Sequence, residues 1–170
     1  MPPSTLRVVT ICTGNICRSP MAEVVLRHRI AADPSLAGRV KVTSAGTARW
    51  HVGDDMDPRA RQALDRGGFA TAGSPAAYAD TELLDSQDLV LVMTKEHRDT
   101  VLERLSNSET QVVLWRQLID PSTSREVSDP YYGPDADFDE CVSVFDRGAD
   151  HLLPLLRDRL VGLEEEEEGG

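Results

Sequence analysis

The chain has 170 residues, of which 40% are hydrophobic and 28% charged, so it is long enough for one well-buried domain and short for two. Its formal net charge of −11 argues against nucleic-acid binding, because that function needs a basic face that displaces counterions. No stretch has the roughly 20 apolar residues of a membrane span and the first residues lack a signal-peptide pattern, so we expect a cytoplasmic protein without membrane contact.

Apolar runs and helical periodicity predict strands that alternate with helices. In chain order the sequence predicts a strand over residues 6–11, a helix from Ser19 or Pro20, a strand over 40–44, a helix over 58–66, a strand over 89–93, a helix over 95–105, a strand over 112–115 and a helix over 138–160. Gly67 and Gly68 are a natural end for the second helix, and Pro154 favours a kink in the last one.

This alternation predicts an α/β fold, a single domain over residues 1–163 with a four-stranded parallel sheet and helices on both faces. Residues 164–170, which are Glu-rich, are predicted to be a disordered, solubilising tail, with an acidic docking tail as the alternative. Ligands of such sheets bind beyond the carboxyl ends of the strands. The loop after the first strand is therefore the first place to look for a site.

That loop, residues 12–20, has the sequence CTGNICRSP, and its residue types suit the binding and displacement of a phosphate. Cys12 ends a strand and can act as a nucleophile toward phosphorus. Gly14 lets the backbone curl so that successive N–H groups converge on an anion, and the following helix N-terminus favours both the anion and a thiolate. Arg18 supplies a planar fork for two phosphate oxygens. The sequence thus predicts a phosphate-binding loop.

Two further side chains of the loop have expected supporting roles: Ser19 donates its hydroxyl to the thiolate, and Asn15 ties the loop backbone together. A nucleotide-binding loop would need a Gly-Lys pair followed by Ser or Thr, which is absent. A zinc site at Cys12 and Cys17 would need two more ligands, from Cys141 or the scattered histidines. Two ordinary buried cysteines that flank a turn are the remaining alternative, since three thiols do not make a disulfide framework.

The Cys-x5-Arg pattern, with Gly-Asn inside it and Ser-Pro-Met-Ala-Glu after it, closely resembles low-molecular-weight protein tyrosine phosphatases of the bacterial type. The resemblance extends from about residue 6 to about residue 160 and includes SAGTARWHVG at residues 44–53 and SDPYYG at residues 128–133. It implies a protein-tyrosine-phosphatase that hydrolyses phosphotyrosine through a phosphocysteine intermediate on Cys12.

By the same resemblance, Arg18 binds the phosphate and Asp129 protonates the departing tyrosine oxygen. Chemistry alone does not single out Asp129 among 29 acidic residues, but Pro130 fixes the backbone beside it. An Asp-Pro turn with two half-buried tyrosines is the alternative interpretation. The substrate-binding residues expected with this catalytic set are Thr13, Gly14, Asn15, Ile16, Cys17, Ser19, Trp50, His51, Tyr131 and Tyr132.

Three other functions on this scaffold are weighed. By resemblance, arsenate reductases share this loop but have two further cysteines in mid-chain. This chain has no cysteine between Cys17 and Cys141. By resemblance, phosphoarginine phosphatases have a similar loop with threonine at the position of Ile16. The apolar side chain of Ile16 favours contact with the aromatic ring of phosphotyrosine. A catalytically dead phosphate-binding module would be expected to lose one of the catalytic residues, all of which are present.

The chain also departs from the family pattern. Many members carry a histidine within the segment that corresponds to residues 72–78 and an aspartate after the third strand, where this chain has Gly73, Ser74 and Thr94. We therefore predict a loop held by different partners. An Asn15 side chain without hydrogen bonds would indicate that the loop is weakly supported.

No metal or organic cofactor is expected, because Arg18 and the loop amides already neutralise the phosphate. The expected partners are phosphotyrosine-containing proteins, and a monomer is the default oligomeric state. Cys17 is a candidate redox partner that would trap an oxidised Cys12 as a disulfide, with a buried space-filling thiol as the alternative. The resemblance also raises phosphorylation of Tyr131 or Tyr132 as a regulatory hypothesis.

Overall fold

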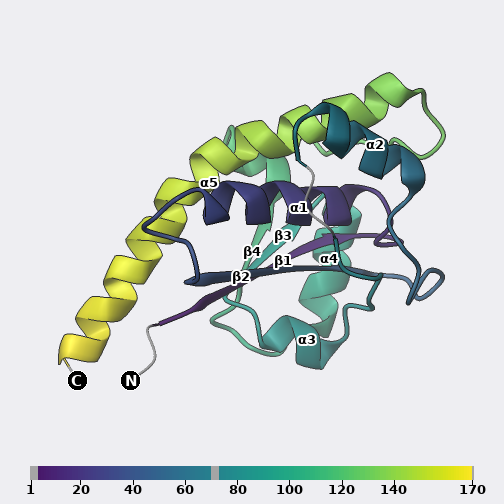
Figure 1. Cartoon of the computed structure of the whole chain (residues 1–170). Helices are drawn as coiled ribbons and strands as arrows, with labels where there is room; N and C mark the ends of the chain where they lie inside the picture. The colour runs from purple at the N-terminus through teal and green to yellow at the C-terminus, as the bar shows by residue number, and fades with distance from the viewer. Residues whose placement is uncertain (1–3, 70–72, 170) are drawn as a thin grey trace.

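The computed structural model describes residues 4–69 and 73–169. Residues 1–3 of the predicted domain, residue 72 of the segment discussed above and residue 170 of the predicted tail lie outside the described residues. In chain order the elements are β1 (Leu6–Cys12), α1 (Arg18–Ala31), β2 (Val40–Gly46), α2 (Pro58–Arg66), α3 (Thr81–Asp85), β3 (Leu89–Val92), α4 (Lys95–Arg104), β4 (Gln111–Leu114), the 3₁₀ helix η1 (Trp115–Leu118) and α5 (Asp135–Gly169) (Figure 1).

The four strands form one parallel sheet in the order β2-β1-β3-β4. Each residue of β3 is buried, as expected for a central strand that is covered on both faces. The pairing of β1 with β2 places Cys12 opposite Gly46, so the two strands end together. The predicted parallel sheet is confirmed, and its carboxyl end supports the loop that begins after Cys12.

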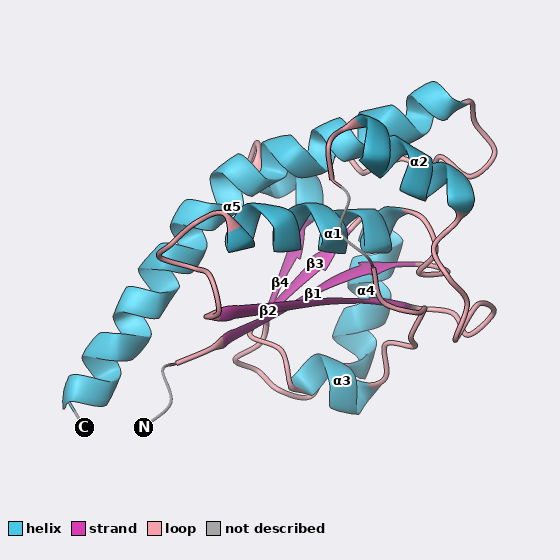
Figure 2. Cartoon of the chain, in the orientation of Figure 1, coloured by secondary structure: helices cyan, strands magenta, loops and turns pink. Residues whose placement is uncertain are grey.

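Helices cover both faces of this sheet, as the sequence predicts (Figure 2). Helices α1, α2 and α5 lie on one face, and α3 and α4 lie on the other. The larger core, under α1 and α5, includes Met21, Phe138 and Phe145, while the smaller one includes Ile11 and Val90. Burying such side chains contributes roughly 1.5–3 kcal/mol each, which holds the layers together.

Helix α5 is longer at both ends than the predicted 138–160. It continues through the Glu-rich segment to Gly169, which corrects the prediction of a disordered tail for the described residues of that segment. Glutamate is a good helix former, and the helix is already nucleated where it packs on α1, so each further residue adds a hydrogen bond. Arg39 also pairs with Glu164. Pro154 lies inside the helix, which changes direction along its length (Figure 1).

Two short elements were not predicted, α3 and η1, because neither is long enough to show a helical period. Asp80 caps α3 by accepting a hydrogen bond from the Leu83 N–H. The other boundaries agree with prediction to within two residues: α2 has the predicted bounds, whereas α1 begins at Arg18 instead of Ser19 or Pro20. Within the described ranges, no helix is both long and apolar enough to cross a membrane.

Candidate active site

The site lies at the carboxyl end of β1, where Cys12 is the last residue of the strand and Arg18 the first of α1. A pocket of about 250 Å³ opens there, lined by Cys12, Thr13, Gly14, Ile16, Cys17, Arg18, Trp50, His51, Asp129, Tyr131 and Tyr132. All three predicted catalytic residues therefore face one cavity. Asn15 and Ser19, which were also predicted to bind substrate, do not line the pocket. Their side chains contact each other on the side of the loop that faces away from it.

The loop between β1 and α1 is held tightly against the end of β2. Asn15 has a φ of 59°, in the left-handed region that asparagine tolerates better than most residues. Gly46 is needed opposite it, because a Cβ there would lie 2.5 Å from the carbonyl oxygen of Thr13. The Thr47 N–H donates to the Cys12 carbonyl at 2.9 Å. The chain after β2 thus continues the pairing and fixes the loop from one side.

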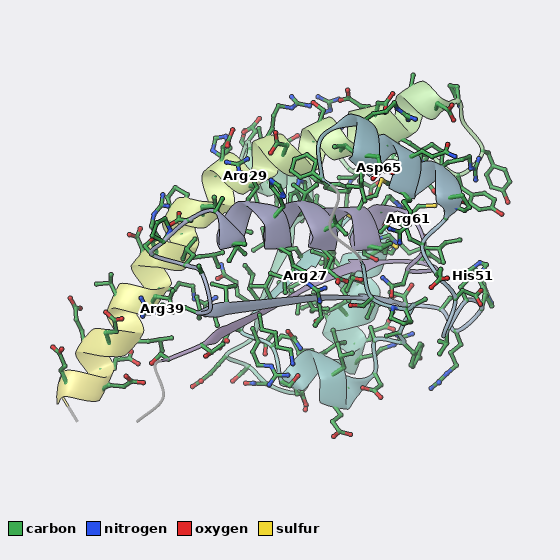
Figure 3. The ribbon with its side chains drawn as sticks, in the orientation of Figure 1. Arg27, Arg29, Arg39, His51, Arg61 and Asp65 are labelled. Carbon is green, nitrogen blue, oxygen red and sulfur yellow. The ribbon has the colours of Figure 1, made fainter. Side chains whose placement is uncertain are left out.

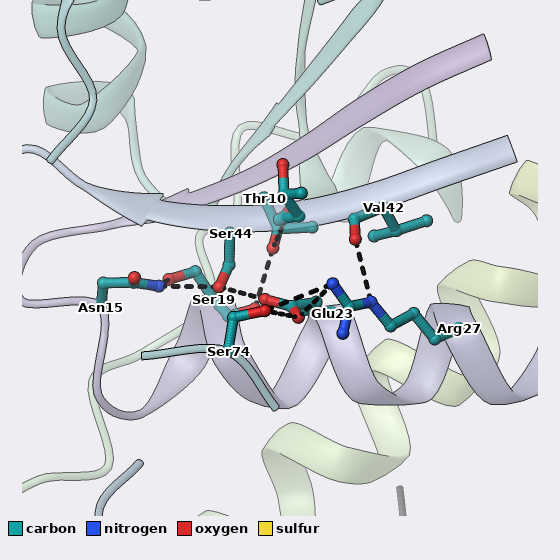
Figure 4. A network of polar contacts seen from close by, with 9 residues as sticks. Thr10, Asn15, Ser19, Glu23, Arg27, Val42, Ser44 and Ser74 are labelled. Atoms are coloured by element: carbon teal, nitrogen blue, oxygen red, sulfur yellow. Dashed lines mark hydrogen bonds and ion pairs between the residues drawn. The ribbon is translucent and has the colours of Figure 1, made fainter. Parts of the chain in front are cut away.

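The Asn15 side chain makes hydrogen bonds through both its nitrogen and its oxygen, and Figure 4 shows those of the nitrogen. Its amide nitrogen donates to the hydroxyl of Ser19 at 2.7 Å and of Ser44 at 2.9 Å. Its oxygen accepts from the Ala77 N–H at 2.9 Å. The condition that would have indicated a weakly supported loop, an Asn15 side chain without hydrogen bonds, is therefore not met.

Behind Ser44 lies Glu23, a carboxylate with no exposed surface. It accepts hydrogen bonds from Ser44 and from Ser74, the latter at 3.0 Å, and pairs with Arg27 at 2.9 Å. Arg27 in turn donates to the Val42 carbonyl at 2.9 Å (Figure 4). The loop is therefore supported by two hydroxyls and by an ion pair between a buried carboxylate and a partly exposed arginine, in agreement with the prediction of different partners.

The hydroxyl of Ser19 and the beginning of α1 both lie beside Cys12. Cys12 is 3% exposed, and its sulfur lies 3.0 Å from the Ser19 hydroxyl. Cys17, which precedes α1, makes no side-chain capping hydrogen bond in the described structure. The first N–H groups of the helix are therefore free to bind an anion.

Arg18 joins the phosphate loop to the segment that carries Asp129. Its side chain is 7% exposed; one terminal nitrogen donates to the Val127 carbonyl at 3.1 Å, and the other lies 3.7 Å from the Asp129 carboxylate. The Val127 N–H donates to the Met93 carbonyl at 2.9 Å, which ties this segment to the end of β3. The side chain of Asp129 is half-exposed and lines the pocket.

Aromatic side chains form the outer walls of the pocket. The rings of Tyr131 and Tyr132 meet edge to face with centroids 4.8 Å apart. Trp50 is 78% exposed, and His51 lies beside it on the loop after β2 (Figure 3), with Nδ1 3.1 Å from an Asp54 oxygen. Such walls leave a slot suited to a flat ring.

His97 is a supporting residue that the sequence did not reveal. Its Nε2 lies 2.8 Å from the Thr13 hydroxyl, while Nδ1 is buried without a hydrogen-bond partner in the described residues. Burial, together with the charge of Arg18, lowers the pKa of His97 from 6.5 to about 4. Thr94, where the family often has an aspartate, caps α4 by accepting from the His97 N–H at 3.1 Å.

The three cysteines are free thiols and all are buried. Burial is the main cause that raises the pKa of Cys17, with Asp57 as a further contribution, so this thiol stays protonated near neutral pH. Burial likewise raises the pKa of Cys141 to about 12. Within the described ranges, no group of histidine, cysteine and acidic side chains is arranged to hold a metal ion.

Comparison with known proteins gives a consistent picture. Residues 7–162 match the model of the family described as low molecular weight phosphotyrosine protein phosphatase. The low molecular weight protein-tyrosine phosphatase A of Mycobacterium tuberculosis is 39% identical over 162 residues, covering 91% of this chain and 94% of that protein.

Two solved structures are also similar to this chain. The crystal structure of YfkJ from Bacillus subtilis has a TM-score of 0.82 at 29% identity and covers 94% of this chain and 99% of that one. The YwlE arginine phosphatase from Geobacillus stearothermophilus has a TM-score of 0.78 at 28% identity and covers 92% of this chain and 96% of that one.

Proposed function

This chain belongs to the low molecular weight phosphotyrosine protein phosphatase family and is a cysteine-dependent protein-tyrosine phosphatase, and we propose that Cys12, Arg18 and Asp129 carry out its reaction. The observation that carries the proposal is their position around one pocket at the end of β1. The 3.0 Å contact between Cys12 and Ser19 supports the choice of Cys12 as nucleophile.

In the first step the Cys12 thiolate attacks phosphorus, so a sulfur–phosphorus bond forms as the bond to the tyrosine oxygen breaks. Asp129 gives its proton to that oxygen, because an unprotonated phenolate is a poor leaving group. Arg18 and the N-terminal amides of α1 bind the equatorial oxygens, whose charge they match in the transition state.

In the second step Asp129, now a carboxylate, takes a proton from a water molecule that attacks the phosphocysteine. The sulfur–phosphorus bond breaks, and inorganic phosphate leaves with the transferred oxygen. The hydroxyl of Ser19 stabilises the Cys12 thiolate as it departs.

The walls of the pocket favour a phosphorylated tyrosine side chain on a protein. Ile16 and Tyr131 offer apolar surface to a phenyl ring, whereas a guanidinium would gain more from a hydroxyl group. Phosphoarginine is the second candidate substrate, because the similar YwlE structure is named an arginine phosphatase. A cytoplasmic location and a monomeric state remain predictions, as does protection of Cys12 by Cys17.

The decisive experiment is single-turnover hydrolysis of phosphotyrosine and phosphoarginine peptides of the same sequence, without added metal. We expect the wild type to prefer phosphotyrosine, Cys12→Ser to be inactive, and Asp129→Ala to be slower by about 10²-fold or more, as for loss of a general acid.

The Arg147→Ala variant is a suitable control, because this arginine pairs with Glu140 on the surface of α5 and should leave the rate unchanged. A preference for phosphoarginine would reject the proposed substrate. Activity in Cys12→Ser equal to that of wild type would reject the proposed nucleophile.

A further inference from the structure

The two loops that form the reaction site come from distant parts of the chain, and the start of α2 lies between them. Asp57 is the N-cap of α2, and its backbone N–H donates to the Ile16 carbonyl of the phosphate loop at 2.8 Å. Its carboxylate accepts from the Arg59 N–H at 2.8 Å. The first turn of α2 is thereby anchored to the phosphate loop.

Arg59 connects Asp57 to the loop that contains Asp129. Its guanidinium binds both oxygens of Asp57, at 3.1 and 2.9 Å. Its remaining terminal nitrogen donates to the Tyr131 carbonyl at 2.7 Å. The guanidinium carbon also lies 5.1 Å from the ring centroid of Tyr131 and 4.8 Å from that of Phe138. The planar fork is thus shared between the two loops, which a lysine could not reproduce.

Tyr131 connects the Arg59 contact to the acid itself. The N–H of Tyr131 donates to one oxygen of Asp129 at 3.1 Å, while its carbonyl accepts the bond from Arg59. The residue that orients the Asp129 carboxyl is therefore the one that Arg59 holds. Arg59 is not among the residues that line the pocket, so it lies behind the pocket wall that Tyr131 helps to form.

We propose that Arg59 is a positioning residue that keeps Asp129 in place to protonate the leaving group. The proposal rests on the proposed role of Asp129 as the general acid. We call the hydrogen bonds of Arg59 to Asp57 and to the Tyr131 carbonyl the Arg59 clamp. Hydrogen bonds from Arg59 are the main cause that lowers the pKa of Asp57, so this carboxylate stays charged near neutral pH and the clamp persists there. Without the clamp, the chain from Asp129 to Tyr131 would move relative to the phosphate loop.

The competing explanation is that Arg59 only stabilises the fold. The two differ in how the rate depends on the leaving group, because a phenol that is acidic enough departs without a proton. We would measure kcat/KM for para-substituted phenyl phosphates of increasing phenol acidity. Partial unfolding lowers kcat/KM for each member of the series by the same factor and leaves the dependence on acidity unchanged.

The variants are Arg59→Ala, Arg59→Lys, Asp129→Ala and the double variant Arg59→Ala/Asp129→Ala. Arg66→Ala is the matched control, because Arg66 lies on the same helix and pairs with Asp139 of α5 at 2.8 Å, away from the pocket. For Arg59→Ala we expect kcat/KM to fall about 10- to 100-fold for the least acidic phenol, as for a misplaced catalytic group, and less than about threefold for the most acidic one.

The loss of kcat/KM in Arg59→Lys should be smaller than that in Arg59→Ala, and Arg66→Ala should have the kcat/KM of the wild type for each phenol. In the double variant, the dependence on phenol acidity should equal that of Asp129→Ala alone, since two residues that act through one step do not add. An equal loss for all leaving groups in Arg59→Ala, or a further steepening in the double variant, would overturn the inference. If Asp129→Ala itself showed no dependence on the leaving group, the assignment of the general acid would fail instead.

Discussion

The hydroxyl of Ser19 has one proton and three neighbours. Its oxygen accepts from Asn15 at 2.7 Å, and it lies 3.0 Å from the Cys12 sulfur and 3.4 Å from the Ala45 carbonyl. The contact with Ala45 is the longest, and a thiolate can only accept. In the mechanism that we propose Cys12 reacts as a thiolate, so the proton of Ser19 is then directed to its sulfur, where it stabilises the negative charge.

Replacing Ser19 with alanine should slow the reaction without abolishing it. A hydrogen bond to a charged group contributes about 1.5–3 kcal/mol, so we expect kcat to fall about 10- to 100-fold in Ser19→Ala. Steady-state hydrolysis of phosphotyrosine peptide measures this effect. Ser86→Ala removes a hydroxyl that bonds only within the α3 region and serves as the control. A kcat of Ser19→Ala within twofold of wild type would contradict the role.

At the scale of elements, α1 performs two tasks along its length. Its first turn presents Arg18 and free N–H groups to the phosphate site. One turn later, Glu23 reaches back toward the loop through Ser44 and pairs with Arg27. Figure 3 shows Arg27 between α1 and the sheet, whereas Arg29 points to α5. The two arginines, two residues apart, therefore support different parts of the protein.

We expect Arg27→Ala to cost about 3 kcal/mol or more in the free energy of unfolding, because it leaves the buried Glu23 carboxylate without its counter-charge. Arg29→Ala breaks ion pairs with Asp146 and Asp150, whose side chains are 47% and 63% exposed, and should cost about 1 kcal/mol. Urea denaturation of both variants measures the difference. Equal losses would show that the Glu23 pair has no special weight.

At the scale of the whole molecule, stability depends on pH through the groups whose ionisation changes on folding. Asp57 and Asp85 accept hydrogen bonds that lower the pKa of each, so both contribute stability that is lost only in acid. His97 differs in kind, because it must lose its proton to be buried beside Arg18. Its effect begins at a higher pH.

The sign for His97 follows from its two pKa values. The unfolded chain takes up the proton near 6.5, whereas burial keeps the folded His97 neutral down to about 4. Between these values the unfolded state binds more protons, so stability falls as the pH falls. We expect wild type to lose up to about 3 kcal/mol relative to His97→Asn between pH 7 and 4. Thermal unfolding of both proteins across this range tests it, and parallel curves would contradict it.

The order of elements and the loop that carries Cys12 and Arg18 could be predicted because both depend on local sequence patterns. Apolar runs and alternating helices indicate a parallel sheet, whose carboxyl end is a known place for ligands. Cys12 and Arg18 are close in sequence and share one loop, so their spacing alone suggests a phosphate site. Asp129 was identified through family resemblance, since nothing in its own chemistry separates it from other acidic residues.

Only the tertiary structure revealed the supporting residues and the helical tail. His97 and Arg59 reach the site from α4 and α2, and their partners, Thr13 and Tyr131, lie far from them in the sequence. The Glu-rich segment is helical because it extends a helix that is already packed against the rest of the protein. The composition of the segment alone could not predict this packing. Local sequence patterns therefore determined the order of elements and the loop that contains the proposed nucleophile, whereas long-range contacts decided what holds them in place.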